Sequence, residues 1–294
     1  MIYIFYKQFK TTNVNRIYFK LDSSKYFQIL INPMIQKKLH IVTYHLTEKG
    51  GDFIRRIKRI FCGYLWEKGY REKNQDSLAF WHLRKGKYHK VMAVLCDGIG
   101  GLEKGEEASS YVVRQLANWF LSEGYKLNLK KQKRMIQQLC FQIHQELLDY
   151  GNENKIHLGT TVAIVLMEGR KIIWLYTGDC RIYWLRNRKV KQLTEEHHDK
   201  NGNLTRAIGV GQWYLLSGGH KKLGKRDRIL MCSDGFYRNL ELKELRIWNE
   251  RTIKNSEQAD RMLKQIFQKK ISAGERDNIS ALYWGYPEKQ EEVL

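Results

Sequence analysis

The stretch Thr161–Asp179, TVAIVLMEGRKIIWLYTGD, holds two apolar runs that are rich in β-branched and aromatic residues and are joined by a three-residue link. Gly169 in that link is typical of a tight turn, so the stretch predicts an antiparallel hairpin. A second hairpin is predicted over 181–193, where RIYWLR and KVKQL flank a short polar link. The chain is therefore expected to build antiparallel sheets and not a doubly wound parallel sheet.

The rest of the chain adds further short strands and a few long helices. Apolar runs predict strands at 41–47, 78–83, 90–96, 228–233 and 279–284. Helical periodicity predicts helices at 108–121, 131–150 and 256–271, the last with Ser256 as its N-cap. A basic amphipathic helix is also expected at 53–66, either packed on the domain or bound to a membrane surface or a partner. Together the patterns predict an α+β fold in which helices cover antiparallel sheets.

The chain of 294 residues is strongly basic, with a formal net charge of +21. Such a charge favours acidic partners such as phosphoproteins, nucleic acid or an anionic membrane. Residues 1–70 hold 13 Lys and Arg against 4 Asp and Glu, but the excess of positive charge runs through the whole chain, which weakens the interpretation as a binding module. Recruitment to nucleic acid or membrane through the basic N-terminal segment is kept as an alternative.

Cysteine usage and hydropathy indicate the compartment. The five cysteines are an odd number without C-x-x-C spacing, which argues against a disulfide framework or a structural zinc site and favours a reducing compartment. The sequence shows no 18-residue apolar run and no secretory signal pattern. A cytoplasmic location is the prediction.

Aspartates stand at the ends of several predicted strands. Asp97 and Asp234 each follow a strand and precede a glycine, and Asp179 ends the opening hairpin. Asp76 and Asp277 each precede a strand. In an antiparallel sheet the end of one strand lies beside the start of its neighbour, so these carboxylates can converge on one rim.

Clustered carboxylates need a cation to remain ionised together. Oxygen ligands without nearby His or Cys suit Mg²⁺ or Mn²⁺, and two such ions activate water for hydrolysis of a phosphate ester. Each aspartate also has a plainer interpretation, because Asp-Gly after a strand is often only a turn. Asp277 beside Arg276 is also compatible with a surface ion pair.

Seven stretches strengthen the metal interpretation by their order along the chain: REKNQDS (71–77), VLCDGIGGLEKGEEAS (94–109), LGTTVAIVL (158–166), YTGDCRIYWLRNRKVKQLTEEHH (176–198), LTRAIG (204–209), ILMCSDGF (229–236) and GERDNISAL (274–282). In this order they resemble the metal-dependent protein serine/threonine phosphatases of type 2C, in the compact bacterial form. The resemblance implies a four-layer αββα sandwich of two antiparallel sheets. It also implies a phosphatase domain over 39–285, an N-terminal extension over 1–38 and a C-terminal tail over 286–294.

The resemblance also implies a set of metal ligands for two Mn²⁺ or Mg²⁺ ions. Asp97 would bridge the two ions, with the carbonyl of Gly98 also in contact. Asp76 would reach the second ion through water, and Asp234 and Asp277 would hold the first.

Two further residues receive roles from the resemblance. Arg71 would bind the substrate phosphate, for which a guanidinium offers paired hydrogen bonds, and Asn278 would support the site. The implied activity is hydrolysis of phosphoserine and phosphothreonine in proteins, opposing a partner kinase. The alternative is a phosphoprotein-binding regulatory module with the same fold and weak or no turnover.

The sequence departs from the family at the proton donor and at a third metal site. Ile99 stands where many eukaryotic members carry a histidine proposed as general acid, so the leaving-group proton would come from water or another side chain. Arg238 replaces an aspartate that, together with the residue matching Asp179, helps to hold a weak third metal. A guanidinium at that place would repel a cation or replace it.

Two more departures lie between the opening hairpin and residue 209. Cys180 replaces a serine and is expected to be a small packed side chain, with a redox-sensing thiol as the alternative. Only 199–204 separate EEHH from TRAIG, where the family usually has a mobile flap of two to three dozen residues, so an open cleft and altered substrate choice are expected. His197 and His198 are expected at the surface.

Overall fold

A computed structural model describes residues 40–46, 52–54, 60–85, 88–187, 189–238, 240–241, 243–246, 253 and 255–286. The extension expected at 1–38 and positions 287–294 of the expected tail lie outside these described residues. The domain boundaries therefore stay a prediction.

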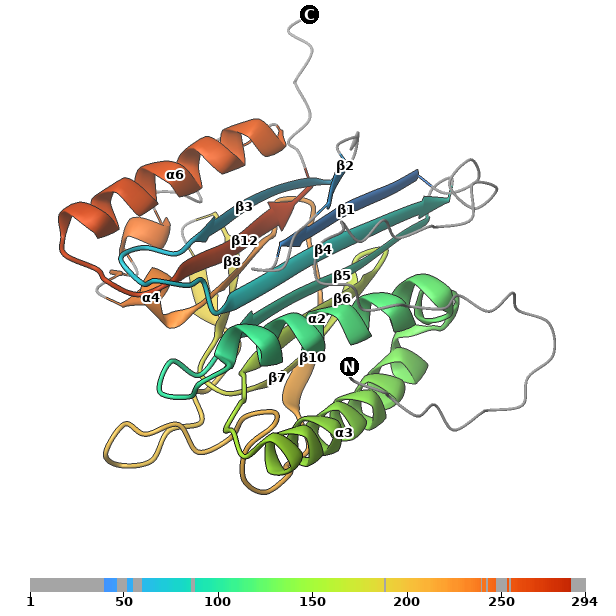
Figure 1. Ribbon diagram of the computed structural model, residues 1–294. Helices are drawn as coiled ribbons and strands as arrows, with labels where there is room; N and C mark the ends of the chain where they lie inside the picture. Colours follow the sequence, from blue (N-terminus) through green and yellow to red (C-terminus); the bar gives the residue numbers. More distant parts are fainter. Residues whose placement is uncertain are drawn as a thin grey trace, which may run out of the picture.

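Two antiparallel sheets form the centre of the described structure (Figure 1). The first contains, in spatial order, β10 (Ser217–Lys222), β7 (Lys171–Thr177), β6 (Val162–Glu168), β5 (Tyr88–Asp97), β4 (Asp76–Lys85), β1 (His40–Leu46) and β2 (Asp52–Ile54). The second contains β3 (Phe61–Glu67), β12 (Ile279–Gly285), β11 (Arg228–Cys232), β8 (Arg181–Arg186) and β9 (Lys189–Gln192). The β6–β7 hairpin has the predicted turn, with Gly169 at φ 59°.

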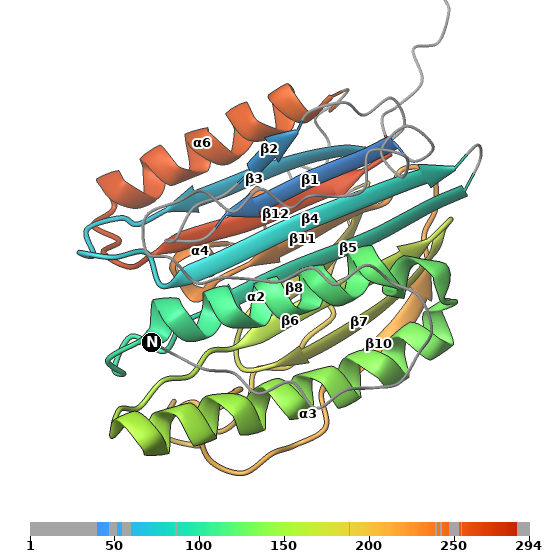
Figure 2. The ribbon, with the colours of Figure 1, turned by 45° about the vertical axis from the view of Figure 1, so that its right-hand side comes forward.

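Helices cover the outer faces of both sheets. The first sheet packs against α2 (Gly105–Ser122) and α3 (Leu129–Asn154), which are joined through the short 3-10 helix η1 (Gly124–Lys126). The second packs against α6 (Ser256–Ser272) and the single turn α4 (Asp234–Tyr237). Figure 2 shows α6 on one side of the sheets and α2 and α3 on the other. The prediction of a four-layer αββα sandwich is confirmed.

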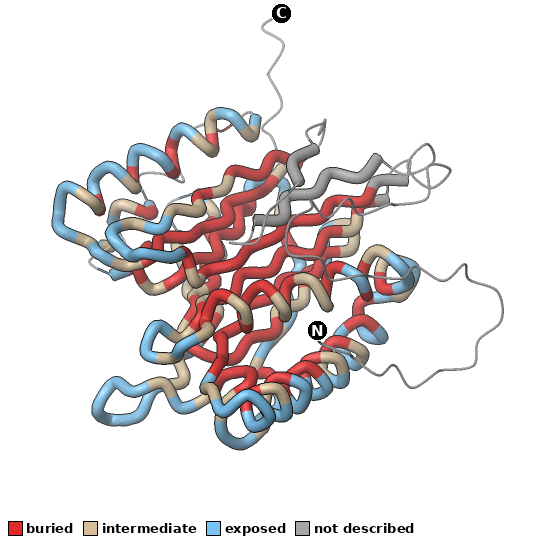
Figure 3. Tube along the Cα trace, viewed as in Figure 1, coloured by how far each residue is buried: buried red, intermediate tan, exposed pale blue. Residues whose placement is uncertain are grey.

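Strand periodicity explains why three separate cores form. Along β5, Met92 and Val94 pack against α2 and α3, whereas Val91 and Ala93 pack between the two sheets. All four are buried, because a strand in the middle of a four-layer structure is covered on both faces. Figure 3 shows the same division, with buried strands inside and helices exposed on their outer faces.

The helix predicted at 53–66 is wrong in its described parts. Asp52–Ile54 forms β2, and Phe61–Glu67 forms β3, which pairs with β12 along its whole length. Phe61 packs under α6 and Cys62 packs between the sheets, so alternate residues enter different cores. Burial on both faces outweighs a helical pattern that was read from the sequence alone.

Two smaller features also differ from the sequence-based expectation. The N-cap of α6 is Asn255, whose Oδ1 accepts a hydrogen bond from the N–H of Gln258 at 2.9 Å. Ser256 instead accepts a bond from the N–H of Cys62 in β3 at 3.0 Å, which ties the helix to the second sheet. Strand β10 was not predicted, because SGGHKK carries no apolar alternation.

Among the described helices, none combines the length and apolar character that crossing a bilayer requires.

Candidate active site

Strand pairing brings the predicted carboxylates to one edge of the two sheets. Asp76 begins β4 and Asp97 ends β5, and the antiparallel register sets these two residues directly opposite each other. Asp234 opens α4 just after β11, and Asp277 stands two residues before β12, the strand that pairs with β11. Each sheet therefore contributes two of these aspartates to the same edge.

The segment around Asp97 is fixed by its backbone. The N–H of Asp97 donates to the hydroxyl of Thr161 at 3.0 Å, and its carbonyl accepts from the hydroxyl of Thr160 at 2.8 Å. At Gly98, a Cβ would lie 2.5 Å from the carbonyl of Gly105 and 2.7 Å from the carbonyl oxygen of Gln75. A glycine is required here, because the turn after β5 passes this close to α2 and to the residue before Asp76.

Asp76 is the most deeply buried of these carboxylates, with 0% of the residue exposed. Burial raises the pKa of Asp76 to about 7, and the charges of Asp234 and Asp277 act in the same direction. The hydroxyls of Ser280 and Ser233 oppose this rise, but neither carboxylate oxygen has a hydrogen bond of good geometry among the described residues. A buried carboxylate without such hydrogen bonds is stabilised by a cation beside it or by protonation.

The neighbouring carboxylates are perturbed in the same way. Burial, followed by the charges of Asp76 and Asp234, raises the pKa of Asp97 well above its ordinary range. Burial also raises the pKa of Asp234 to about 6, although the charge of Arg238 opposes the change. Like charges gathered at one edge of the sheets are the common cause of these shifts, after burial.

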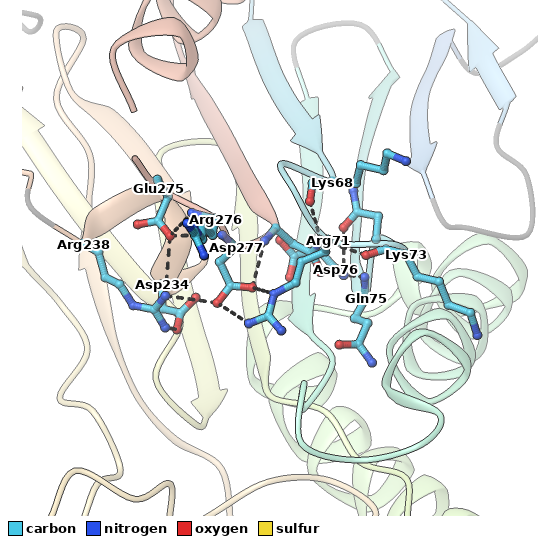
Figure 4. Close-up of polar contacts among 12 residues, drawn as sticks. Lys68, Arg71, Lys73, Gln75, Asp76, Asp234, Arg238, Glu275, Arg276 and Asp277 are labelled. Atoms are coloured by element: carbon cyan, nitrogen blue, oxygen red, sulfur yellow. Dashed lines mark hydrogen bonds and ion pairs between the residues drawn. The ribbon is translucent and has the colours of Figure 1, made fainter. Parts of the chain in front are cut away.

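Two arginines neutralise one half of the cluster (Figure 4). The Nε and one terminal nitrogen of Arg71 donate to the two oxygens of Asp277 at 3.1 and 3.2 Å. Arg238 donates to the same carboxylate at 3.0 Å and also contacts Asp234. Burial by itself would raise the pKa of Asp277, but the N–H of Asn278 and the two guanidinium groups outweigh it and leave that pKa lowered.

Asn278 ties together the two chain segments that carry these groups. Its Oδ1 accepts from the N–H of Gln75 at 2.8 Å, and its Nδ2 donates to the carbonyls of Lys68 and Lys73 at 2.9 and 3.0 Å. The side chain is nearly fully buried, so these bonds are shielded from water. The loop that holds Arg71 is thereby fixed to the start of β12.

A further group of candidate ligands lies around Asp179, which follows β7. Ligand atoms of Asp97, Asp179 and Cys180 all lie within 4.8 Å of one another. The Nε2 of His198 lies 3.3 Å from an Asp179 oxygen. Cys180 is buried, its thiol lies 3.2 Å from the hydroxyl of Thr161, and burial raises its pKa well above its usual value. This geometry supports the interpretation of Cys180 as a packed side chain.

His197 does not lie freely at the surface as expected. Its ring stacks on Tyr176 with centroids 5.1 Å apart. Nδ1 accepts from the N–H of Gly178 at 3.0 Å, and Nε2 lies 3.0 Å from the hydroxyl of Ser217. Gly178 has φ +103°, a conformation that favours glycine, and the bond from its N–H to His197 holds the turn that presents Asp179.

Glu275 is a residue of the site that the sequence analysis did not single out. Glu275 accepts from the N–H groups of Arg276 and Asp277 at 2.9 and 3.1 Å, and so shapes the turn before β12. Its carboxylate also lies 3.6 Å from Arg238. A glutamate within the motif GERDN was the available signal, but the pattern did not reveal that it shapes the turn.

The connection at 199–204 is a compact turn. Asp199 Oδ1 accepts from the N–H groups of Asn201 and Asn203 at 2.8 and 2.9 Å, and Thr205 N–H donates to the carbonyl of His197 at 2.7 Å. This turn stands where the family usually carries its flap.

Comparisons with known proteins identify the family of the chain. A family model described as protein phosphatase 2C matches residues 70–273. The serine/threonine phosphatase stp of Listeria monocytogenes serotype 4b (strain F2365) is 26% identical over 237 residues, covering 72% of this chain and 90% of that protein. The protein phosphatase PhpP of Streptococcus pneumoniae serotype 2 is 25% identical over 210 residues, covering 60% of this chain and 78% of that protein.

A solved structure has the same fold. The serine/threonine phosphatase Stp1 from Staphylococcus aureus superposes with a TM-score of 0.68 at 20% sequence identity, covering 82% of this chain and 99% of that chain. The family model spans more than half of the sequence and includes Arg71, Asp97 and Asp234. The chain belongs to the protein phosphatase 2C family.

Proposed function

We propose that this phosphatase hydrolyses phosphoserine and phosphothreonine in proteins at a centre of two Mn²⁺ or Mg²⁺ ions. The proposed ligands are Asp76, Asp97, the carbonyl of Gly98, Asp234 and Asp277. The observation that carries the proposal is the buried Asp76 carboxylate opposite Asp97, neither oxygen of which has a hydrogen bond of good geometry among the described residues. Relatives that carry the name serine/threonine phosphatase support the substrate class.

The residues present fit hard divalent ions. The donor set is made of carboxylates and a backbone carbonyl, which Mg²⁺ and Mn²⁺ prefer. The raised pKa values of Asp76, Asp97 and Asp234 show that the folded chain does not by itself offset the clustered charge. When bound, the two ions would supply an acidified water and a positive clamp on a phosphoryl oxygen.

Arg71 is proposed to bind the substrate phosphate. Its side chain is 49% exposed, and its Nε and one terminal nitrogen donate to Asp277. Part of its guanidinium remains accessible, so it can donate to phosphoryl oxygens without leaving the site. Asn278 acts as a positioning residue, because it fixes the Arg71 loop and Asp277 to each other.

Asp179 is proposed as at most a weak ligand of a third ion. The Nε2 of His198 lies 3.3 Å from an oxygen of Asp179, and Arg238, which contacts Asp234, replaces the aspartate that would help Asp179 hold an ion. The proposed hydrolysis of the phosphate ester therefore relies on two ions and not on a third.

The substrates are proposed to be phosphoproteins, in particular those of a partner serine/threonine kinase. Recruitment to nucleic acid or membrane through the basic N-terminal segment involves residues outside the described part of the chain, and it stays a prediction together with the cytoplasmic location. A binding module with weak turnover is the less favoured function, because the acidic set is complete and is held in place by Asn278 and Thr161.

The test is Mn²⁺-dependent hydrolysis of a phosphothreonine peptide by the wild-type chain and by Asp234→Asn. The substitution is expected to lower kcat/KM by about 100-fold or more. The matched control is Asp149→Asn, which makes the same change at an exposed position on α3 and is expected to keep activity. Turnover that ignores metal, or that Asp234→Asn leaves unchanged, would refute the proposal.

A further inference from the structure

We propose that Arg238 is a tethered cation that competes with a metal ion for Asp234 and Asp277. A metal ion would then bind between Asp234 and Asp277 only when the guanidinium of Arg238 has moved away from them. The inference rests on the metal centre of the proposed function and concerns Arg238, which stands where the family motif usually has an aspartate.

The contacts of Arg238 are those of a counter-ion placed between two carboxylates. Each of its two terminal nitrogens contacts a different carboxylate (Figure 4). One contacts Asp234, and the other lies 3.0 Å from Asp277. The second nitrogen also lies 3.6 Å from Glu275. A guanidinium that spans two proposed metal ligands offers them the charge that the ion would otherwise supply.

The backbone of Arg238 is fixed, whereas its side chain can leave. The N–H of Arg238 donates to the carbonyl of Asp234 at 2.8 Å, and Lys270 donates to the carbonyl of Arg238. The side chain is 46% exposed, so rotation into solvent needs no change in the fold. Burial tends to lower the pKa of Arg238, but the surrounding carboxylates outweigh it, so the group remains a cation.

The second half of the cluster has no such competitor among the described residues. The oxygens of Asp76 are without a hydrogen bond of good geometry there, and within the same part of the chain no arginine forms an ion pair with Asp97. The two halves therefore differ in how they are neutralised. A metal ion is expected to enter first beside Asp76 and Asp97, and more weakly beside Asp234 and Asp277.

The experiment is a calorimetric titration of the full chain, stripped with EDTA and dialysed, with MnCl₂. The variants are Arg238→Ala, Arg238→Gln, Arg238→Lys and, as a matched control, Arg261→Ala. Arg261 pairs with Glu257 at 3.2 Å on the exposed face of α6, so its removal changes the net charge equally without touching the cluster.

The expected result is a tight and a weak class of site in the wild-type chain. The weak class should tighten about tenfold in Arg238→Ala and Arg238→Gln, because Asp234 then has no guanidinium to exchange for the ion and Asp277 keeps only Arg71. Arg238→Lys should fall in between, and Arg261→Ala should match the wild type. Identical isotherms for the wild type and the neutral variants would overturn the inference, as would the absence of Mn²⁺ binding in every chain.

A second readout covers a variant that folds poorly. Thermal unfolding in EDTA should show a lower midpoint for Arg238→Gln than for the wild type, and saturating Mn²⁺ should raise the midpoint of the variant more. An equal shift on Mn²⁺ addition in both chains would count against the competition. A chain that behaves as expected here but hydrolyses no phosphopeptide would retain this inference and lose the proposed reaction.

Discussion

Replacing the buried carboxylate at position 76 should stabilise the metal-free protein while it removes activity. Asp76 is 0% exposed and has no hydrogen bond of good geometry to either carboxylate oxygen among the described residues. Burial raises its pKa from the ordinary 3.8 to about 7. Asp76→Asn keeps the shape of the side chain and deletes the charge, so the unfavourable ionisation disappears.

The magnitude and its sign follow from the pKa of Asp76. The shift spans about 3 units, and each unit corresponds to about 1.4 kcal/mol, so ionised Asp76 costs about 4 kcal/mol. Between pH 3.8 and about 7 the folded state holds a proton that the unfolded state has lost, so wild-type stability falls as the pH rises through this window. Asp76→Asn should therefore gain about 2 kcal/mol at pH 5 and about 4 kcal/mol at pH 8.

The assay is urea unfolding in EDTA at both pH values, followed by tryptophan fluorescence. Asp149→Asn, an exposed site, should change the free energy of unfolding by less than about 0.5 kcal/mol. With Mn²⁺ added, the advantage of Asp76→Asn should shrink, because the wild type keeps the complete set of proposed ligands and binds the ion more tightly than the variant. The reasoning is refuted if Asp76→Asn is no more stable than the wild type at pH 8 in EDTA.

Three other residues give separate predictions. Arg71→Ala should lower kcat/KM for a phosphothreonine peptide by about 10- to 100-fold through lost phosphate hydrogen bonds, and recovery of full activity by Arg71→Lys would contradict the paired-donor role. Asn278→Ala should lower the free energy of unfolding by about 2–4 kcal/mol, since it leaves three backbone groups unpaired; a urea midpoint close to that of the wild type would contradict this. Burial, then the charges of Arg206 and His198, lowers the pKa of His197 to about 4 from 6.5, so stability should be lost as the pH falls through this window. His197→Asn should remove about 1–2 kcal/mol of that loss after allowance for solvent screening, and an unchanged pH–stability profile would count against it.

Much of the fold could be predicted because its strands are short, apolar and bounded by turns. The hairpin at 161–179 and the helix covering 131–150 follow from local periodicity, which needs no knowledge of distant contacts. The helix predicted at 53–66 was wrong because alternate side chains of β3 enter two different cores. This arrangement depends on pairing with β12, which lies more than 200 residues away in the sequence. Strand β10 has almost no apolar side chains and is defined by pairing with β7.

The candidate site, too, could be predicted from the sequence only in part. The positions of Asp76, Asp97, Asp234 and Asp277 followed from strand ends, because antiparallel pairing sets such ends side by side. The neutralisation of one half of the cluster did not follow from the sequence, since it depends on which carboxylates the Arg238 side chain reaches. The structural role of His197 depends likewise on Tyr176 and on the turn at Gly178, which only the folded chain brings together.

The central claim is that two metal ions share Asp97 at the edge of the two sheets. It is tested most directly by an anomalous difference map from crystals of the full chain grown with Mn²⁺. The expected map shows two peaks that share the Asp97 carboxylate, one on the side of Asp76 and the other on the side of Asp234 and Asp277. A map without manganese beside Asp97, or with peaks only at other places on the surface, would contradict the account.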